Sequence, residues 1–144
     1  MKRSTFIRHV AILTLLIIIF TAMTSCGEPA FGDFGEFQVE VKEIEINNDN
    51  PDKPYIIITY AFTNNSNSAE NFMYNIGDTV FQNNVCLEET SYASHPTQTT
   101  PVKSGTTYDV IGMYYLQDLT SDIEIEFKHY WSEKITTKVF EISE

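Results

Sequence analysis

Residues 55–63 read YIIITYAFT, and the alternation of their side chains decides the fold class. Every second position from Ile56 to Phe62 is large and apolar, so one face of an extended chain is suited to a core. β-Branched and aromatic residues dominate, and nine residues are too few for a typical buried helix. The stretch predicts a strand whose core face comprises Ile56, Ile58, Tyr60 and Phe62.

The same period of two recurs on both sides of this stretch. Apolar residues alternate from Phe37 to Val41, and the phase slips at Lys42-Glu43, which indicates a β-bulge. The cleanest alternation lies later, from Ile123 to Lys128. Further strands are expected at 72–76, 79–82, 85–87, 106–116 and 135–142. Short strands without a helical period predict an all-β fold, an antiparallel β-sandwich.

Turn-forming residues separate the expected strands. Gly77-Asp78 is interpreted as a break between two strands, and Asn83-Asn84 as a tight hairpin, because asparagine tolerates positive φ. No strand is expected before Phe37. The other turns and loops are expected at 47–52, 64–68, 90–100 and 103–105.

The first 25 residues have the three-part layout of a secretory signal. Lys2, Arg3 and Arg8 precede an uncharged apolar run at 10–20, and small residues follow it. As a helix this run would span roughly 16 Å, about half of a hydrocarbon core of ~30 Å. A cleaved signal is therefore favoured over an uncleaved membrane anchor, and cleavage at another small residue is a further alternative.

Cys26 indicates the kind of signal. The stretch Met23-Thr24-Ser25-Cys26-Gly27 resembles a bacterial lipobox, with Met23 standing where leucine is usual. The resemblance implies that Cys26 is acylated and begins the mature chain, and two or three acyl chains make such an attachment lasting. The predicted organisation is a lipoprotein signal peptide at 1–25, a lipid-anchored linker at 26–36 and a sandwich domain at 37–144. The predicted location is the extracytoplasmic face of the cell membrane.

The charge balance excludes one class of partner. The 144-residue chain has 9 lysines and arginines against 20 acidic residues, a formal charge of −11. From Cys26 onward it keeps six lysines, no arginine and all 20 acidic residues, a formal charge of −14. Because phosphate contacts need clustered cations, no nucleic acid is expected as a partner. Solvated outer strand faces are the favoured interpretation of Glu40, Glu43, Glu45, Glu124 and Glu126. The alternative is an acidic surface that repels anionic lipids and polymers or recruits a cationic partner.

Several short strings occur in a fixed order: Ile57-Ile58-Thr59-Tyr60, Phe62-Thr63-Asn64-Asn65-Ser66, Val80-Phe81-Gln82-Asn83-Asn84-Val85, Leu87-Glu88, Val102, Ser104-Gly105-Thr106-Thr107, Tyr115-Leu116 and Thr120-Ser121-Asp122-Ile123-Glu124. Together they resemble a family of extracytoplasmic lipoprotein domains, the domain of unknown function five thousand and sixty-seven. The likeness covers 37–141, and it departs at Asn84 and Ser104, where the family commonly has Gly and Pro. The resemblance implies an immunoglobulin-like β-sandwich of about 7–8 strands. It also implies bacterial lipoproteins, commonly of Gram-positive species, with no established activity.

Known catalytic patterns are missing from the sequence. It has no Gly-x-Ser-x-Gly, His-Glu-x-x-His or Cys-x-x-Cys, and no phosphate-binding glycine loop. If Cys26 carries lipid, Cys86 has no partner for a disulfide, and its apolar neighbours predict a buried structural thiol. His95 is expected in an exposed loop, and His129 is interpreted as a partly buried structural residue. We therefore expect no enzymatic activity, no catalytic residues and no cofactor.

One stretch has the start of a calcium-binding pattern. Asn48, Asn50 and Asp52 offer oxygen atoms at alternate positions. Counted from Asn48, however, the sixth position is Lys53 rather than Gly and the twelfth is Thr59 rather than Glu. An Asx-rich turn is favoured, and no metal site is expected.

Two adjacent aromatic pairs remain as candidate ligand-binding residues: Tyr114, Tyr115, Tyr130 and Trp131. One member of each pair should face away from the core, where an exposed ring can stack on a sugar or contact a protein. The predicted function is a non-enzymatic, lipid-anchored binding module at the bacterial cell envelope, with an envelope protein or a wall polymer as its partner. Two alternatives stay open: a sensor or inhibitor subunit of a membrane-bound enzyme or transporter, and a wall-carbohydrate-binding module.

Overall fold

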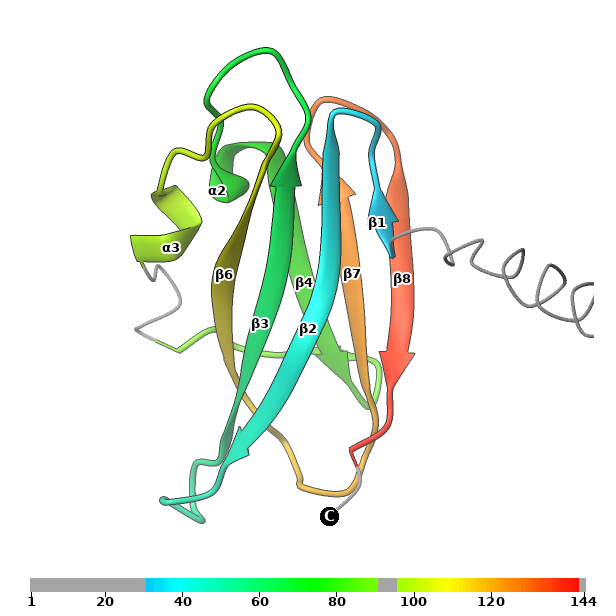
Figure 1. Ribbon diagram of the computed structural model, residues 1–144. Coiled ribbons are helices and arrows are strands. Elements are labelled where there is room, and N and C mark those ends of the chain that lie inside the picture. Colours follow the sequence, from blue (N-terminus) through cyan, green and yellow to red (C-terminus); the bar gives the residue numbers. More distant parts are fainter. Residues whose placement is uncertain (1–30, 91–95, 143–144) are drawn as a thin grey trace, which may run out of the picture.

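Two four-stranded antiparallel sheets pack face to face in the computed structural model, which describes residues 31–90 and 96–142 (Figure 1). The first sheet has, in spatial order, β1 (Gly32–Asp33), β2 (Phe37–Asn47), β3 (Tyr55–Asn64) and β6 (Thr106–Tyr115). The second has β5 (Val85–Cys86), β4 (Ile76–Gln82), β7 (Ile123–His129) and β8 (Ile135–Phe140). Two one-turn helices, α2 (Phe72–Asn75) and α3 (Pro96–Thr99), complete the fold. The predicted antiparallel β-sandwich is confirmed.

The strand order is that of an immunoglobulin-like sandwich. The chain forms a hairpin of β2 and β3, then crosses to the other sheet and returns, so that β3 pairs with β6 and β4 pairs with β7. These pairings correspond to the B–E and C–F pairs of immunoglobulin domains. The last hairpin pairs β7 with the edge strand β8, as strand F pairs with the edge strand G in those domains.

The strand that decides the fold class lies at the centre of the first sheet. β3 pairs with β2 on one side and, along its whole length from Tyr55 to Asn64, with β6 on the other. Its buried face consists of Ile56, Ile58, Tyr60 and Phe62, as predicted. The register of β2 against β3 shifts between Val41 and Glu43, which confirms the predicted bulge.

Aromatic rings fill the space between the sheets. The Tyr60 ring stacks on Phe72 with centroids 5.7 Å apart and meets Phe127 edge-on at 5.1 Å. The ring centroid of Phe62 lies 5.7 Å from the ring centroids of both Phe37 and Phe72. Such contacts add about 0.5–1.5 kcal/mol each to the free energy gained by burying the rings. The core therefore links β2, β3, α2 and β7.

The hairpin between β4 and β5 has the predicted geometry. Asn83 and Asn84 both have positive φ, 54° and 61°. Two consecutive positive φ values define the type I′ turn, whose twist matches that of the flanking strands. The turn at residues 103–105 is also confirmed, with Gly105 at φ 72°.

Three predictions about local structure were wrong. Residues 72–75 form α2 rather than a strand, because the Asn71 side chain accepts a hydrogen bond from Tyr74 N at 3.0 Å and caps the helix. Gly77 and Asp78 lie inside β4 and do not break it. A strand, β1, precedes Phe37 in the part of the chain that the structure describes.

Cys86 is exposed, which corrects the prediction of a buried thiol. It lies in β5, a strand of two residues at the edge of its sheet. Alternation with apolar neighbours predicts burial only where a second layer covers the strand, and both residues of β5 are exposed.

Several predictions fall on residues that the structure does not describe. They concern the signal peptide at 1–25, Cys26 with the linker up to residue 30, and His95. Among the described residues, no helix is both long and apolar enough to cross a membrane.

Candidate functional site

The structure separates the four candidate aromatic residues. Tyr114 is buried, with 2% of its surface exposed, and Tyr115 is half-buried on the outer face of β6. One member of this pair therefore faces outward, as predicted, but the Tyr114 ring cannot serve as a stacking surface. Tyr130 and Trp131 are 53% and 78% exposed, so both members of the second pair face solvent.

Tyr130 and Trp131 begin the turn between β7 and β8, at the end of the sandwich where α2 also lies (Figure 1). The backbone N–H of Tyr130 donates to the carbonyl of Asn75 at 3.0 Å and fixes this turn to α2. A surface groove of about 590 Å³ follows the turn. We call this the aromatic groove, and it is lined by Lys128, Tyr130, Trp131, Ser132, Glu133 and Ile135.

Gly77 allows Tyr130 to lie against β4. A Cβ at position 77 would be 2.7 Å from the Tyr130 hydroxyl oxygen and 3.0 Å from two of its ring carbons. Any larger side chain would therefore displace the Tyr130 ring. The glycine that the sequence suggested as a turn residue instead provides the space in which an exposed aromatic ring packs.

Behind Tyr130 lies a cavity of about 110 Å³ with two carboxylates in its lining. We call it the acid cavity. Asp78 comes from β4, and Glu89 lies beyond β5, where it forms a β-bridge with Tyr114. The whole lining is Phe72, Met73, Ile76, Asp78, Glu89, Gln98 and Tyr130. Tyr130 belongs to both the acid cavity and the aromatic groove, so the two hollows share a wall.

The pKa of Asp78 is perturbed in this cavity. Burial raises its pKa, and the hydrogen bond from Tyr114 offsets part of that rise. The Tyr114 hydroxyl donates to Asp78 Oδ2. The pKa of Glu89 is raised as well, mainly by partial burial and secondly by the negative charge of Asp78. Both carboxylates are thus less easily ionised than carboxylates in water.

Two buried tyrosines, Tyr60 and Tyr114, lie close to Asp78 but do not line the acid cavity. Burial, followed by the charge of Asp78, holds the pKa of both Tyr60 and Tyr114 well above the usual value. Their hydroxyls therefore stay protonated and act as donors. The Tyr60 hydroxyl is fully buried, yet it has no hydrogen bond of normal geometry to any residue in the described part of the chain. Gly112 leaves room for both rings, since a Cβ there would lie 3.0 Å from Tyr114 and 3.1 Å from Tyr60.

The charge of the acid cavity is not balanced by the described residues. No lysine within 31–90 and 96–142 forms an ion pair with Asp78 or Glu89. The one ion pair in these ranges joins Lys42 Nζ to Asp109 Oδ2 at 2.6 Å, on the exposed side of the first sheet. Ionisation of the half-buried Asp78 without a cationic partner is energetically unfavourable, whereas Glu89 is exposed and stays in contact with water.

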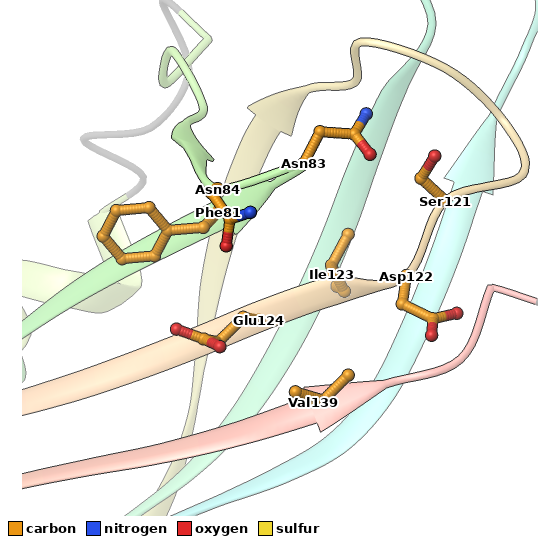
Figure 2. Close-up of a pocket in the computed structure, with 8 residues that line it drawn as sticks. All are labelled: Phe81, Asn83, Asn84, Ser121, Asp122, Ile123, Glu124 and Val139. Carbon is orange, nitrogen blue, oxygen red and sulfur yellow. The ribbon is translucent and has the colours of Figure 1, made fainter.

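A larger hollow lies at the opposite hairpin and is drawn in Figure 2. It measures about 410 Å³, with the hairpin residues Asn83 and Asn84 at one end and Val139 of β8 at the other. The Asn83 side-chain amide donates to Asp118 Oδ2 at 2.9 Å, so its N–H group has a structural partner within the protein. The acid cavity, unlike this hollow, has one of the exposed candidate aromatic residues, Tyr130, in its wall, and we therefore favour it as the functional site.

Tyr115 lines a fourth hollow, of about 220 Å³, together with Lys53, Tyr55 and Met113. The Lys53 ammonium lies 3.6 Å from the centre of the Tyr115 ring. This cation–π contact covers the ring face that would otherwise be open to a ligand. Tyr115 is therefore a weaker candidate than Tyr130 or Trp131.

The remaining residues considered for chemistry have structural roles. His129 is half-buried, as predicted, with its ring 5.9 Å from Phe34 and 5.6 Å from Phe37. In the turn at 47–52, Asn50 Oδ1 accepts from Asp52 N at 3.2 Å, which confirms the predicted Asx turn. No group of three His, Cys, Asp or Glu side chains able to hold a metal occurs in the described residues.

Sequence reasoning missed Asp78 and Glu89. Gly-Asp is a common turn pair, so the prediction of a break at residues 77–78 hid a charged residue within a buried strand. The signal that was available is the apolar residue on each side, Ile76 and Val80, both of which are buried. Ile76 and Val80 belong to one strand, and Asp78 lies between them on the same face of that strand.

Comparison with known proteins places the chain in a family. The family model described as Domain of unknown function (DUF5067) matches residues 28–129. The chain belongs to this family. The prediction from the short strings along the sequence is confirmed, and the match spans the sandwich from β1 to β7. No curated protein is similar enough to this chain to count as a match.

Two solved structures share the fold. One is a protein of Staphylococcus aureus named as a candidate lipoprotein, with a TM-score of 0.56 and 20% identity, covering 74% of this chain and 84% of that chain. The other is a protein of Bacillus subtilis, ycdA, also named as a candidate lipoprotein. It has a TM-score of 0.59 and 14% identity, covering 80% of this chain and 39% of that chain. At these identities the likeness concerns the fold.

Proposed function

We propose that this protein is a lipid-anchored, non-enzymatic binding module on the extracytoplasmic face of the bacterial cell envelope. The lipobox-like stretch ending at Cys26 supports the anchor. The two structural neighbours named as candidate lipoproteins support an envelope location. The absence of catalytic sequence patterns supports a binding role rather than an enzymatic one.

The anchor is tested by cell fractionation of the full chain. Cys26→Ala should prevent lipid attachment, change the mobility of the protein on a gel and release it from the membrane fraction. Cys86→Ala is the matched control, because it removes the other cysteine of the chain and should leave fractionation unchanged. Membrane association that persists in Cys26→Ala would contradict the lipid anchor and favour an uncleaved signal.

The single observation that carries the binding role is the exposure of Trp131 beside Tyr130. Large aromatic side chains are costly to leave in water and are enriched in binding surfaces. Here two adjacent rings are exposed along the aromatic groove, and one of them also forms a wall of the acid cavity. We therefore place the binding surface at this end of the sandwich.

Proximity labelling in the native organism tests this surface. A labelling enzyme fused to the C-terminus should mark a defined set of neighbours with the unaltered chain, and fewer of them after Tyr130→Ala and Trp131→Ala. Tyr108→Ala is the control, because Tyr108 is a 36% exposed aromatic residue on the other sheet. Equal labelling by all variants would refute a partner at the aromatic groove.

Trp131 also favours a second candidate function, a wall-carbohydrate-binding module. Exposed aromatic rings can stack on sugar rings as well as on protein side chains. Sedimentation of the purified protein with isolated wall polymer distinguishes the two. Carbohydrate binding predicts co-sedimentation that Trp131→Ala abolishes, whereas a protein partner predicts no co-sedimentation.

A further inference from the structure

We propose that the free edge of β8 pairs with a second copy of this chain, antiparallel and about a two-fold axis at Thr137. This inference goes beyond the proposed function, and it depends on neither the lipid anchor nor the acid cavity. Three features carry it: an open strand edge, the contrast with the other edges of the two sheets, and a sequence in β8 that is complementary to itself.

The hydrogen bonds of β7 show which backbone groups of β8 point outward. The Tyr130 N–H donates to the carbonyl of Asn75 at 3.0 Å in the β4–β7 register, so even-numbered residues of β7 bond to β4. The His129 N–H donates to the carbonyl of Lys134 at 3.3 Å in the β7–β8 register, so odd-numbered residues of β7 bond to even-numbered residues of β8. The residues of β8 that direct their N–H and carbonyl groups away from β7 are therefore Ile135, Thr137 and Val139.

This side of β8 is open in the part of the chain that the structure describes. β8 is the last strand of its sheet. The outward backbone groups of Ile135, Thr137 and Val139 have no hydrogen bond to any residue within 31–90 and 96–142. A row of unpaired N–H and carbonyl groups along an edge is a template for another strand.

The other described edges are short, covered or protected. β1 and β5 have two residues each. Along β6, Tyr114 forms a β-bridge with Glu89, and the Ile111 N–H donates to Thr97 Oγ1 at 3.1 Å. Beyond β1, the edge of β2 has a bulge after Val41 and carries four charged side chains: Glu40, Lys42, Glu43 and Glu45. Short strands, bulges and charges all prevent edge-to-edge pairing, and β8 has six residues in an unbroken register.

The one charged side chain of β8 does not protect its outer face. The Lys138 ammonium lies 5.5 Å from the centre of the Phe140 ring and 5.9 Å from that of Phe31, on the side of β8 that faces the other sheet. On the outer face Ile135 and Val139 are 49% and 56% exposed, and the side chain between them is Thr137. β-Branched side chains of this kind favour packing against a neighbouring strand.

The order of these side chains fits a second copy of β8. With Thr137 opposite its own counterpart, Ile135 of each copy lies opposite Val139 of the other. Pairs of β-branched aliphatic residues and pairs of threonines are both favourable across antiparallel strands. Such an interface is isologous, so it closes at two copies and does not continue into a fibre.

Charge selects this register over its two neighbours. An axis at residue 136 would place Lys134 of one copy opposite Lys138 of the other, and an axis at residue 138 would place Lys138 opposite itself. Like charges directly opposite are destabilising. With the axis at Thr137, Lys138 lies opposite Thr136, and the only like-charged pair is Glu133 with Glu141, which flank the strand. Because both chains are acidic, added salt should strengthen the dimer.

Pairing through β8 would bring two surface hollows together. Ile135 lines the aromatic groove, and Val139 lines the hollow of Figure 2. These two residues would be neighbours across the axis, so the aromatic groove of one copy would lie beside the hollow of the other. The dimer would therefore present a longer binding surface than one chain.

Cysteine crosslinking of the full chain in intact cells tests the axis. Cys86→Ala provides the background, because Cys86 is exposed. Residues 137 of the two copies should have Cα atoms about 5.5 Å apart, which a disulfide can bridge. We expect Thr137→Cys to give a disulfide-linked dimer under mild oxidation, and Thr107→Cys, at an exposed threonine of β6, to give none. No product at position 137, or equal product at both positions, would overturn the proposal.

Co-expression of two tagged variants tests the register. Ile135→Cys and Val139→Cys should form a mixed disulfide with each other, because these positions are opposite only with the axis at residue 137. Neither variant should crosslink to itself, since its two cysteines would be four residues out of register. Self-linking that equals the mixed product would contradict this pairing.

A proline variant tests the backbone contacts. Thr137→Pro removes an N–H that points away from β7, so it should leave the sandwich folded by circular dichroism. It should weaken dimerisation about tenfold or more, because each copy loses one inter-strand hydrogen bond. Thr137→Val keeps the N–H and should dimerise like the unaltered chain. Sedimentation of the full chain in density-matched nonionic detergent measures both.

Val139→Glu is the second variant if the proline disturbs the fold. Val139 is exposed in the single chain, so the change should leave folding unaffected, yet it places a charge against Ile135 of the other copy. Dimerisation should again weaken. An unaltered chain that sediments as a monomer, or a folded variant that dimerises as tightly as the unaltered chain, would overturn the proposal and leave the aromatic groove untouched.

Discussion

The Tyr114 hydroxyl donates a hydrogen bond to Oδ2 of Asp78, and this bond joins β6 in one sheet to β4 in the other. It fixes the orientation of a carboxylate that also opens into the acid cavity. One residue pair therefore contributes to the packing of the sandwich and to the charge of the candidate site.

Tyr114→Phe should lower the free energy of unfolding by about 1–3 kcal/mol, because it leaves the Asp78 carboxylate without its main donor. Urea denaturation followed by circular dichroism measures the change. Tyr115→Phe is the matched control, since Tyr115 is half-buried on the outer face of the same strand. Equal stability of both variants would show that the bond between the sheets contributes little.

The raised pKa of Asp78 predicts a pH dependence of stability. Burial is the main cause of the rise, so between the unfolded and folded pKa values the native state binds more protons than the unfolded state. Stability of the unaltered protein relative to Asp78→Asn should therefore fall as the pH rises through this window. Urea midpoints across the acid range measure it, and a difference that stays constant with pH would contradict the assignment.

Asp118 should behave in the opposite way. Backbone N–H groups of Thr120 and Ser121 donate to it at 2.8 and 2.6 Å, and these bonds hold its pKa well below the usual value. The stability that they contribute is present above the unfolded pKa and is lost as the pH falls through the folded pKa. The urea midpoint of Asp118→Asn should thus lie below that of the unaltered chain at neutral pH and approach it in strong acid.

For this second carboxylate, Asp122→Asn is the control variant, because Asp122 is an exposed acid in the same loop. A midpoint difference for Asp118→Asn that does not shrink on acidification would show that its ionised form is not what stabilises the loop.

The positive φ of Asn84 makes position 84 sensitive to residue type. Asn84→Ala should destabilise the protein by about 1 kcal/mol, since a Cβ is unfavourable in the left-handed region and alanine lacks the side-chain amide. Asn84→Gly should be neutral or slightly stabilising, because glycine adopts positive φ freely. Thermal melting compares the two, and a more stable alanine variant would contradict the type I′ turn.

The sequence predicted the parts of the fold in which local pattern and burial agree. In β3, Tyr60 and Phe62 face the core as their period of two requires. The bulge after Val41 and the hairpin at Asn83 follow from local signals, a slipped phase and an asparagine pair. These features depend on few distant contacts, so the sequence is sufficient to identify them.

The sequence failed where a contact from a distant residue decides the local structure. Gly77 and Asp78 look like a turn until the Tyr130 ring and the Tyr114 hydroxyl are placed against them. Cys86 looks buried until β5 is seen to lie at an uncovered edge. Of the candidate residues, Tyr130 and Trp131 could be selected from the sequence, but the carboxylate near Tyr130 could not.

We propose that the Tyr130–Trp131 end of the sandwich contacts a partner in the envelope. Placing a photo-crosslinking amino acid at position 131 of the full chain in living cells tests this contact directly, with position 108 as the control. We expect a discrete crosslinked product from position 131, lost when Tyr130 is also replaced by Ala, and none from position 108. Crosslinking that is absent at position 131, or equally strong at both positions, would contradict it.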